Sequence, residues 1–173
     1  SIIQGITEFL PVSSSGHLVA LGTFLGLEST QLDDVNIALH FGTLLAICSV
    51  YFQQIKQLFS SDRKWLTSLV IGSIPAGVVG VTLQILDFNE TLYQPEIAGS
   101  MLIVTGLLLW FGKVEEESTE NVTSFVCPKS ALAIGLMQAF AILPGISRSG
   151  VTIVTAKRMG LPSALAARFS FLL

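Results

Sequence analysis

Two short polar motifs interrupt an otherwise apolar sequence, and the first combines a carboxylate, a run of hydroxyls and an imidazole. It occupies residues 4–17 and reads QGITEFLPVSSSGH. Gln4 and Glu8 lie four residues apart and would share one face of a helix, which Pro11 would end. The serines at 13–15 then supply hydroxyls and successive backbone N–H donors, the kind of concavity that holds phosphate oxygens. The motif predicts an anion site beside a carboxylate.

Each feature of this first motif also has a plainer structural interpretation. The Glu8 carboxylate could reach a membrane interface near a helix end, although an ionisable group inside a membrane segment is by default a functional hypothesis. His17 could be a buried histidine bonded to a backbone carbonyl. One serine of the triplet could cap a helix N-terminus, which would leave the other two unexplained. The sequence leaves these alternatives open.

The second motif places an arginine between two serines in a glycine-flanked turn before an apolar stretch. It occupies residues 143–152 and reads LPGISRSGVT. The guanidinium of Arg148 is a fixed fork of donors matched to phosphate, and a helix beginning at this turn would add backbone donors and a favourable dipole. The alternative is an Arg148–Glu8 pair that only holds the two motifs together. The motif predicts phosphate binding.

The two motifs are also related to each other by an offset of 134 residues. Residues 4–16 and 138–150 both read Gln-x8-Ser-x-Ser-Gly. Four matches in one short window could arise by chance in a chain rich in Ser and Gly, but paired interrupted segments are typical of repeat-built membrane proteins with a midplane site. We therefore expect the two turns to face each other. The matched pairs are Gln4 with Gln138, Ser13 with Ser147, Ser15 with Ser149, and Gly16 with Gly150.

The elements that position these motifs are predicted to be membrane helices. Of the 173 residues 51% are hydrophobic and only 12% are charged, against roughly a quarter charged in soluble proteins. Residues 35–52, 65–86 and 97–112 contain no charged side chain and are each near the ~20 residues that span a bilayer. Pro75 should bend the second of these helices. The net charge of −3, without a basic cluster, excludes a nucleic-acid partner.

The charged connections divide and orient a single membrane domain over residues 1–173. Residues 53–64 are basic and should face the cytoplasm, as should an acidic linker at 113–129. Residues 1–34 and 130–173 carry Ser, Gly and Pro inside apolar stretches, and broken backbone at membrane depth must be buried in protein or line a wet cavity. We therefore expect an all-α polytopic bundle with three transmembrane helices at 35–112 between two re-entrant, inverted-repeat regions.

Three side chains outside the motifs receive no role from the sequence. His40, in the first spanning stretch, is interpreted as a core histidine bonded to a helix carbonyl. Cys48 and Cys127 have neither a CxxC spacing nor nearby histidines, so they are not predicted to bind a metal.

Together the two motifs resemble the undecaprenyl-diphosphate phosphatase family, the bacitracin-resistance membrane phosphatases. The family's signatures are Glu/Gln-x-x-x-Glu leading into a Ser-rich turn with His, and Pro-Gly-x-Ser-Arg-Ser-x-x-Thr; residues 4–17 and 144–152 match them. The resemblance covers the whole chain and implies that further membrane helices follow in the family, so that this sequence is a fragment. It also implies a bacterial plasma-membrane enzyme with its site toward the outer face.

The reaction implied by the resemblance is removal of the terminal phosphate of undecaprenyl diphosphate, which recycles the carrier lipid for cell-wall synthesis. Either Ser14 or His17 is the nucleophile, and the metal is Mg2+ or Ca2+, held by Glu8 and by Gln4, which stands where the family also has Glu. The implied catalytic residues are Glu8, Ser14, His17 and Arg148. The implied phosphate-binding residues are Ser13, Ser15, Ser147, Ser149, Gly150 and Thr152.

The competing hypothesis is a transporter or flippase for a phosphate-bearing lipid, because interrupted helices around a midplane anion site are also a transporter architecture. A flippase would need the anion site but no nucleophile. A purely structural subunit would leave Glu8 and Arg148 as a buried pair that apolar residues could replace. Membrane lipids surround the protein under each hypothesis, and the sequence leaves open whether it is a monomer or a homodimer.

Overall fold

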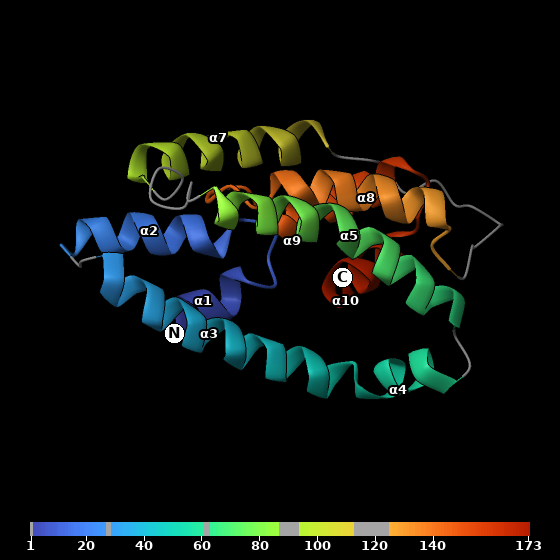
Figure 1. The fold of residues 1–173 in the computed structure, drawn as a ribbon. Helices are drawn as coiled ribbons and strands as arrows, with labels where there is room; N and C mark the ends of the chain where they lie inside the picture. The colour runs from blue at the N-terminus through green and yellow to red at the C-terminus, as the bar shows by residue number, and fades with distance from the viewer. Residues whose placement is uncertain (1, 27–28, 61–62, 87–93, 113–124) are drawn as a thin grey trace.

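The computed structural model describes residues 2–26, 29–60, 63–86, 94–112 and 125–173, and every regular element in these ranges is a helix (Figure 1). The predicted all-α class is confirmed. In chain order the helices are α1 Ile2–Thr7, α2 Ser14–Phe24, α3 Ser29–Val50, α4 Phe52–Ser60, α5 Arg63–Ile85, α7 Pro95–Phe111, α8 Pro128–Phe140, α9 Arg148–Arg158 and α10 Ser163–Leu172.

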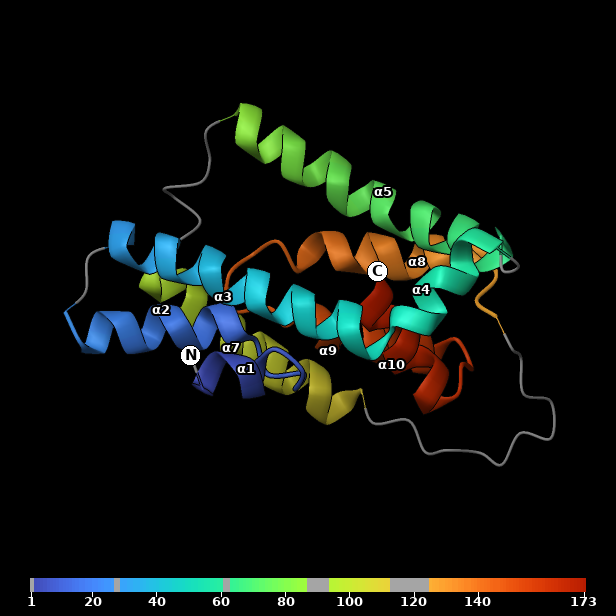
Figure 2. The same ribbon diagram turned by 90° about the horizontal axis from the view of Figure 1, so that it is seen from below.

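The centre of the bundle is α8, which packs against α5 and α9, and α9 packs in turn against α10 and α7. At the other end α2 lies beside α7 and α3 (Figures 1 and 2). The α5–α8 contact is a backbone contact, since a Cβ at Gly135 would collide with the carbonyl of Gly72. Trp65 and Phe169 pack beside it with ring centroids 5.9 Å apart and ring planes tilted by 53°. These helices form the framework on which the second turn is built.

The predicted spanning helices differ in how well they fit a bilayer. Helix α5 has 23 residues and is long and apolar enough to cross a membrane, and it stays one helix through Pro75. The stretch predicted at 35–52 lies in α3, which qualifies only together with α4, across a 69° bend. Helix α7 is apolar but has only 17 residues. Among the described residues, the prediction of three full spans is therefore confirmed for one helix, or two with the bent pair.

The basic segment predicted as a loop at 53–64 is mostly helical. Helix α4 carries Gln53, Gln54, Lys56 and Gln57, while Leu58 is buried and Phe59 is exposed. Such a two-faced helix suits the boundary between lipid and water, which is why charge counting alone took it for a loop. Of the predicted acidic linker, residues 113–124 lie outside the described residues, and α8 already begins at Pro128.

The two motif regions are interrupted helices, as the sequence predicts. Helices α1 and α2 flank the first turn, and α8 and α9 flank the second; they have 6, 11, 13 and 11 residues. At 1.5 Å per residue none of them reaches across a ~30 Å hydrocarbon core. Each turn is followed immediately by a helix N-terminus, that of α2 after the first turn and that of α9 after the second.

Candidate functional site

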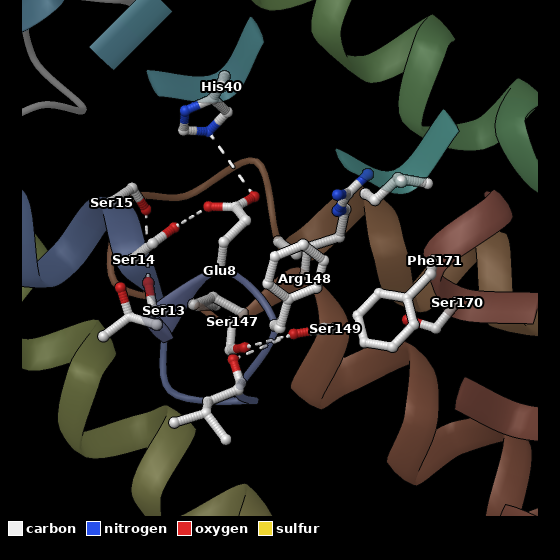
Figure 3. A pocket seen from close by; sticks show the side chains of 16 residues that line it. Glu8, Ser13, Ser14, Ser15, His40, Ser147, Arg148, Ser149, Ser170 and Phe171 are labelled. Atoms are coloured by element: carbon white, nitrogen blue, oxygen red, sulfur yellow. Dashed lines mark hydrogen bonds and ion pairs between the residues drawn. The ribbon is translucent and has the colours of Figure 1, made fainter. Parts of the chain in front are cut away.

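A cavity of about 320 Å³ lies where the two turns meet (Figure 3). The first motif contributes Glu8 and the serines 13–15 to its wall, the second contributes residues 146–149, and α3 adds His40. The sequence prediction that the two turns face each other is confirmed by this shared lining and by a hydrogen bond of 3.4 Å from Ser149 Oγ to the Leu10 carbonyl.

The first turn is closed by a serine in an unusual backbone conformation. Ser13 has φ 63°, a left-handed value that most side chains disfavour, and its Oγ accepts a hydrogen bond from Gly16 N at 3.4 Å. Ser13 thus caps the N-terminus of α2, as one plainer interpretation predicted. The cap accounts for one serine only, because Ser14 and Ser15 also line the cavity.

Glu8 is the acceptor for two donors at once. Ser14 Oγ donates to Glu8 Oε2 at 2.5 Å, and Gln4 Nε2 donates to the same oxygen at 2.6 Å. The other carboxylate oxygen, Oε1, lies 4.0 Å from His40 Nε2. The Glu8 side chain is only 13% exposed, so these contacts, rather than bulk water, hold the carboxylate. The Ser14 hydroxyl and a base that could take its proton are therefore already in contact.

The second turn is held from below by Thr105 of α7. The Thr105 hydroxyl donates to the Gly145 carbonyl at 2.8 Å and accepts from the Ser147 N–H at 3.1 Å. Gly145 adopts φ 96°, which glycine takes without strain. Ser147 Oγ accepts from Gly150 N at 3.1 Å and caps α9. The turn thereby aims the first residues of α9 at the cavity.

Arg148 is the cation of the site. Its exposed side chain lines the cavity and projects toward the same side as Glu8 (Figure 3). Within the described ranges its guanidinium makes neither a hydrogen bond nor an ion pair, and the Glu8 carboxylate contacts Ser14, Gln4 and His40 instead. The proposed structural Arg148–Glu8 pair is therefore not formed. The fork of donors is open to an anion.

The N-termini of α2 and α9 add to this positive field. Ser14 and Ser15 begin α2, Arg148 and Ser149 begin α9, and all four line the cavity. A helix N-terminus carries unsatisfied N–H groups and about half a positive charge, so two of them beside Arg148 favour an anion with several oxygens. The Glu8 carboxylate adds a negative charge and a proton acceptor to the same cavity.

Four predicted residues are not part of the cavity lining, and one of them is Gln4, which instead contacts Glu8. His17 is exposed, its Nδ1 lies 2.7 Å from the Ser13 carbonyl, and it is not part of the lining. Thr152 is buried and bonds to the Arg148 carbonyl at 2.8 Å and to Ser170 Oγ at 2.6 Å. Gly150 uses its N–H in the cap. The structure gives the last two a supporting position behind Arg148; their predicted phosphate contacts, and the role of His17, stay predictions.

His40 and Thr105 belong to the site although the sequence analysis did not select them. His40 lines the cavity and approaches Glu8, instead of serving as a core residue; its side chain is 47% exposed. Thr105 is 3% exposed and lies on a neighbouring helix. In the sequence, the only sign of either residue is a polar side chain within an apolar stretch. That sign does not identify the group that the side chain contacts.

The residues fit a sparsely held divalent cation. Mg2+ is usually bound through one or two carboxylates together with substrate phosphates, and Glu8 is the carboxylate of this cavity. Gln4 Oε1 is buried and has no hydrogen-bond partner in the described structure, so an amide oxygen is also unused one helix turn away. No group of three or more acidic, His or Cys side chains that could hold a metal occurs among the described residues.

Fold and site together define a helical membrane protein with an anion cavity between two interrupted helices. The chain belongs to the family described as bacitracin resistance protein BacA, whose model matches residues 1–173. The predicted family is thus confirmed.

Curated relatives place the chain more closely within this family. It is 47% identical to an undecaprenyl-diphosphatase of Rhodopirellula baltica over 174 residues, 100% of this chain and 66% of that protein. Identities to proteins of the same name are 39% in Halothermothrix orenii and 40% in Thermodesulfovibrio yellowstonii, each covering 99% of this chain and 66% of the relative. The chain thus spans about two thirds of the length of the relatives it matches.

Proposed function

We propose that the protein hydrolyses undecaprenyl diphosphate to undecaprenyl phosphate and inorganic phosphate, the activity in the name of its relatives. One observation carries the proposal. The same cavity holds Arg148, whose guanidinium has no hydrogen bond or ion pair within the described residues, and a Ser14 hydroxyl that already donates to Glu8. A site that only bound the lipid would need the cation but not the activated hydroxyl. The arrangement therefore favours the phosphatase over the flippase.

In the proposed mechanism the diphosphate lies against Arg148 and the N-termini of α2 and α9. These donors neutralise charge on the transferred phosphoryl group, which is the main requirement of phosphoryl transfer. Ser14 Oγ attacks the terminal phosphorus and its proton passes to Glu8 Oε2. The bond from that phosphorus to the bridging oxygen breaks, and undecaprenyl phosphate leaves. Ser14 is favoured over His17 as nucleophile because His17 does not line the cavity.

The second half of the reaction releases phosphate from the seryl phosphate. Glu8, protonated in the first half, gives that proton to the departing lipid phosphate. A water then attacks the phosphorus of the seryl phosphate while Glu8 accepts one of its protons. The P–O bond to Ser14 breaks, Glu8 passes this proton to Ser14 Oγ, and inorganic phosphate departs. A bound Mg2+ would supply further positive charge, with Glu8 as its protein ligand. The roles of Arg148 and Ser14 require no change of position between the halves.

The proposal also includes the orientation and symmetry predicted from the sequence. The two turns share a capping hydrogen bond, because Ser13 and Ser147 each accept from the N–H of the glycine three residues later. Their neighbours Ser15 and Ser149 each lie 3.4 Å away, Oγ to Oγ. This likeness supports the repeat. The inverted arrangement and the opening of the cavity toward the outer face are proposed from the charges of the connecting segments.

The test is phosphate release from undecaprenyl diphosphate in detergent by the protein expressed from its complete reading frame, with and without Mg2+. Ser14→Ala and Arg148→Ala should each lower the rate by at least about 100-fold, the size of a lost nucleophile or charge clamp, while Arg148→Lys recovers part of it. Release that survives Ser14→Ala would exclude Ser14 as the nucleophile and return that role to His17. A well-folded wild type that releases no phosphate would move the assignment to the flippase.

A further inference from the structure

We propose that His40 is a positioning residue for this site: together with Gln4 it holds the Glu8 carboxylate in the orientation that receives the Ser14 proton. The inference rests on the proposed function and extends it to a helix outside both motifs. Three contacts carry it, joining His40 to Gln4, Gln4 to Glu8, and Glu8 to Ser14.

The orientation of the Gln4 amide follows from its partner. The Gln4 group nearest Glu8 Oε2 lies 2.6 Å away, and an ionised carboxylate only accepts hydrogen bonds. The amide nitrogen must therefore face Glu8, because an amide oxygen at that distance would place two acceptors in contact. The same Nε2 lies 3.4 Å from His40 Nδ1. Gln4 can thus donate one hydrogen to the carboxylate and the other to the imidazole.

This donor fixes the tautomer of His40. A ring nitrogen that accepts a hydrogen bond carries no proton, so in the neutral imidazole the proton is on the other nitrogen. Nδ1 accepts from Gln4, and Nε2 therefore bears the hydrogen. Nε2 lies 4.0 Å from Glu8 Oε1, with its N–H on the side of the carboxylate opposite to Ser14. Contacts of this kind are often long before substrate binds and shorten in the complex.

The consequence is a carboxylate with polar neighbours at both oxygens. Oε2 accepts hydrogen bonds from Ser14 and Gln4, and Oε1 lies 4.0 Å from His40 Nε2, which is longer than a hydrogen bond. Rotation of the carboxyl group away from Ser14 would break the two hydrogen bonds and move Oε1 away from the His40 N–H. The charged groups that face His40 across the cavity are Glu8 from the α1 turn and Arg148 from α9. His17 of α2 and Lys56 of α4 are not part of the lining.

The test compares His40→Ala with His40→Gln in the protein expressed from its complete reading frame. A glutamine at 40 can accept from Gln4 and donate to Glu8 Oε1, whereas alanine can do neither. His40→Ala should lower kcat roughly 10- to 100-fold, as for other side chains that orient a catalytic group, with KM for undecaprenyl diphosphate unchanged. His40→Gln should keep most of kcat and the wild-type pH profile. Phe41→Ala, an exposed neighbour outside the lining, is the matched control.

A wild-type kcat in His40→Ala would overturn the inference. So would His40→Gln being as slow as His40→Ala, since glutamine can make both contacts and only a role such as proton transfer by the imidazole would then remain. If His40→Ala unfolds, His40→Phe decides: it keeps a ring of similar size but can neither accept from Gln4 nor donate to Glu8, so its kcat should fall as expected for His40→Ala. Arg148→Ala is measured alongside. Release that depends on Arg148 but not on His40 contradicts only this inference, whereas no release by the wild type contradicts the proposed function.

Discussion

At the scale of single residues, Thr105 shows how much one buried hydroxyl can determine. It serves two backbone groups of the second turn, one as donor and one as acceptor. Thr105→Val keeps the shape but leaves the Gly145 carbonyl and the Ser147 N–H unpaired, which costs about 1–3 kcal/mol for each buried group. We expect a clearly lower melting temperature in detergent and weaker binding of diphosphate.

The control for this prediction is Thr82→Val in α5. Thr82 Oγ1 bonds to the carbonyl one turn earlier in its own helix at an exposed position, and that carbonyl keeps its helix hydrogen bond when the hydroxyl is lost. Calorimetry or fluorescence melting of the two variants should separate them. Equal melting temperatures would show that the second turn does not depend on Thr105.

The sequence is informative about residues that chemistry already makes conspicuous, and less so about their partners. Glu8 and Arg148 are predictable because a charge inside an apolar chain needs a function. His40 and Thr105 reach the site only through helix packing, which brings positions 40 and 105 beside turns at 8 and 147. His17 illustrates the opposite case, since its place near Ser14 in sequence does not put its ring in the cavity.

At the scale of elements, the contact between α5 and α8 should be sensitive to one methyl group. A Cβ at Gly135 would collide with backbone atoms of Gly72, and backbone cannot move aside as a flexible side chain can. Gly135→Ala should therefore destabilise the protein by about 1–3 kcal/mol through overpacking, and should loosen the framework behind Arg148.

Gly77→Ala in α5 is the paired comparison, because nothing lies within 4 Å of its added Cβ. Helix propensity alone then acts and favours alanine by up to ~1 kcal/mol. Thermal unfolding should thus shift in opposite directions for the two variants. A shift in the same direction would mean that α5 and α8 are not in backbone contact.

Element positions follow well from the apolar pattern, and element ends do not. The stretches predicted at 65–86 and 97–112 correspond closely to α5 and α7. The 69° bend after α3 was not predictable from charge, because a two-faced helix and a polar loop have the same composition over nine residues. The two differ in how the apolar and polar side chains are distributed over the faces of a helix, and composition does not record this.

At the scale of the whole molecule, the orientation in the membrane can be read from Cys127. A hydrogen bond from the Ser130 side chain lowers the pKa of its thiol, helped by backbone N–H groups at the start of α8 and by Lys129. A lowered pKa gives more thiolate at a given pH, and thiolate is the reactive form. Alkylation of Cys127 should therefore reach its half-maximal rate at a lower pH than an ordinary thiol, and Ser130→Ala should move it upward.

In sealed cells the same thiol reports sidedness. The predicted cytoplasmic position of 113–129 requires that a membrane-impermeant maleimide label Cys127 only after lysis, in a Cys48→Ser background. Cys127→Ser supplies the blank. Labelling of intact cells would place the start of α8 outside and invert the proposed orientation.

The close packing of the two turns has a consequence for how the lipid reaches and leaves the site. A Cβ at Gly16 would lie 2.9 Å from Gly145 Cα, and one at Gly150 would lie 3.2 Å from the Pro11 carbonyl. A transporter that works by rocking must separate its two repeats at such a contact to open the site to the other face of the membrane. In this structure the backbones of the two turns are closely packed against each other. We therefore expect the cavity to open to one face of the membrane only. The lipid enters and both products leave on that face, and another protein moves the lipid across the bilayer.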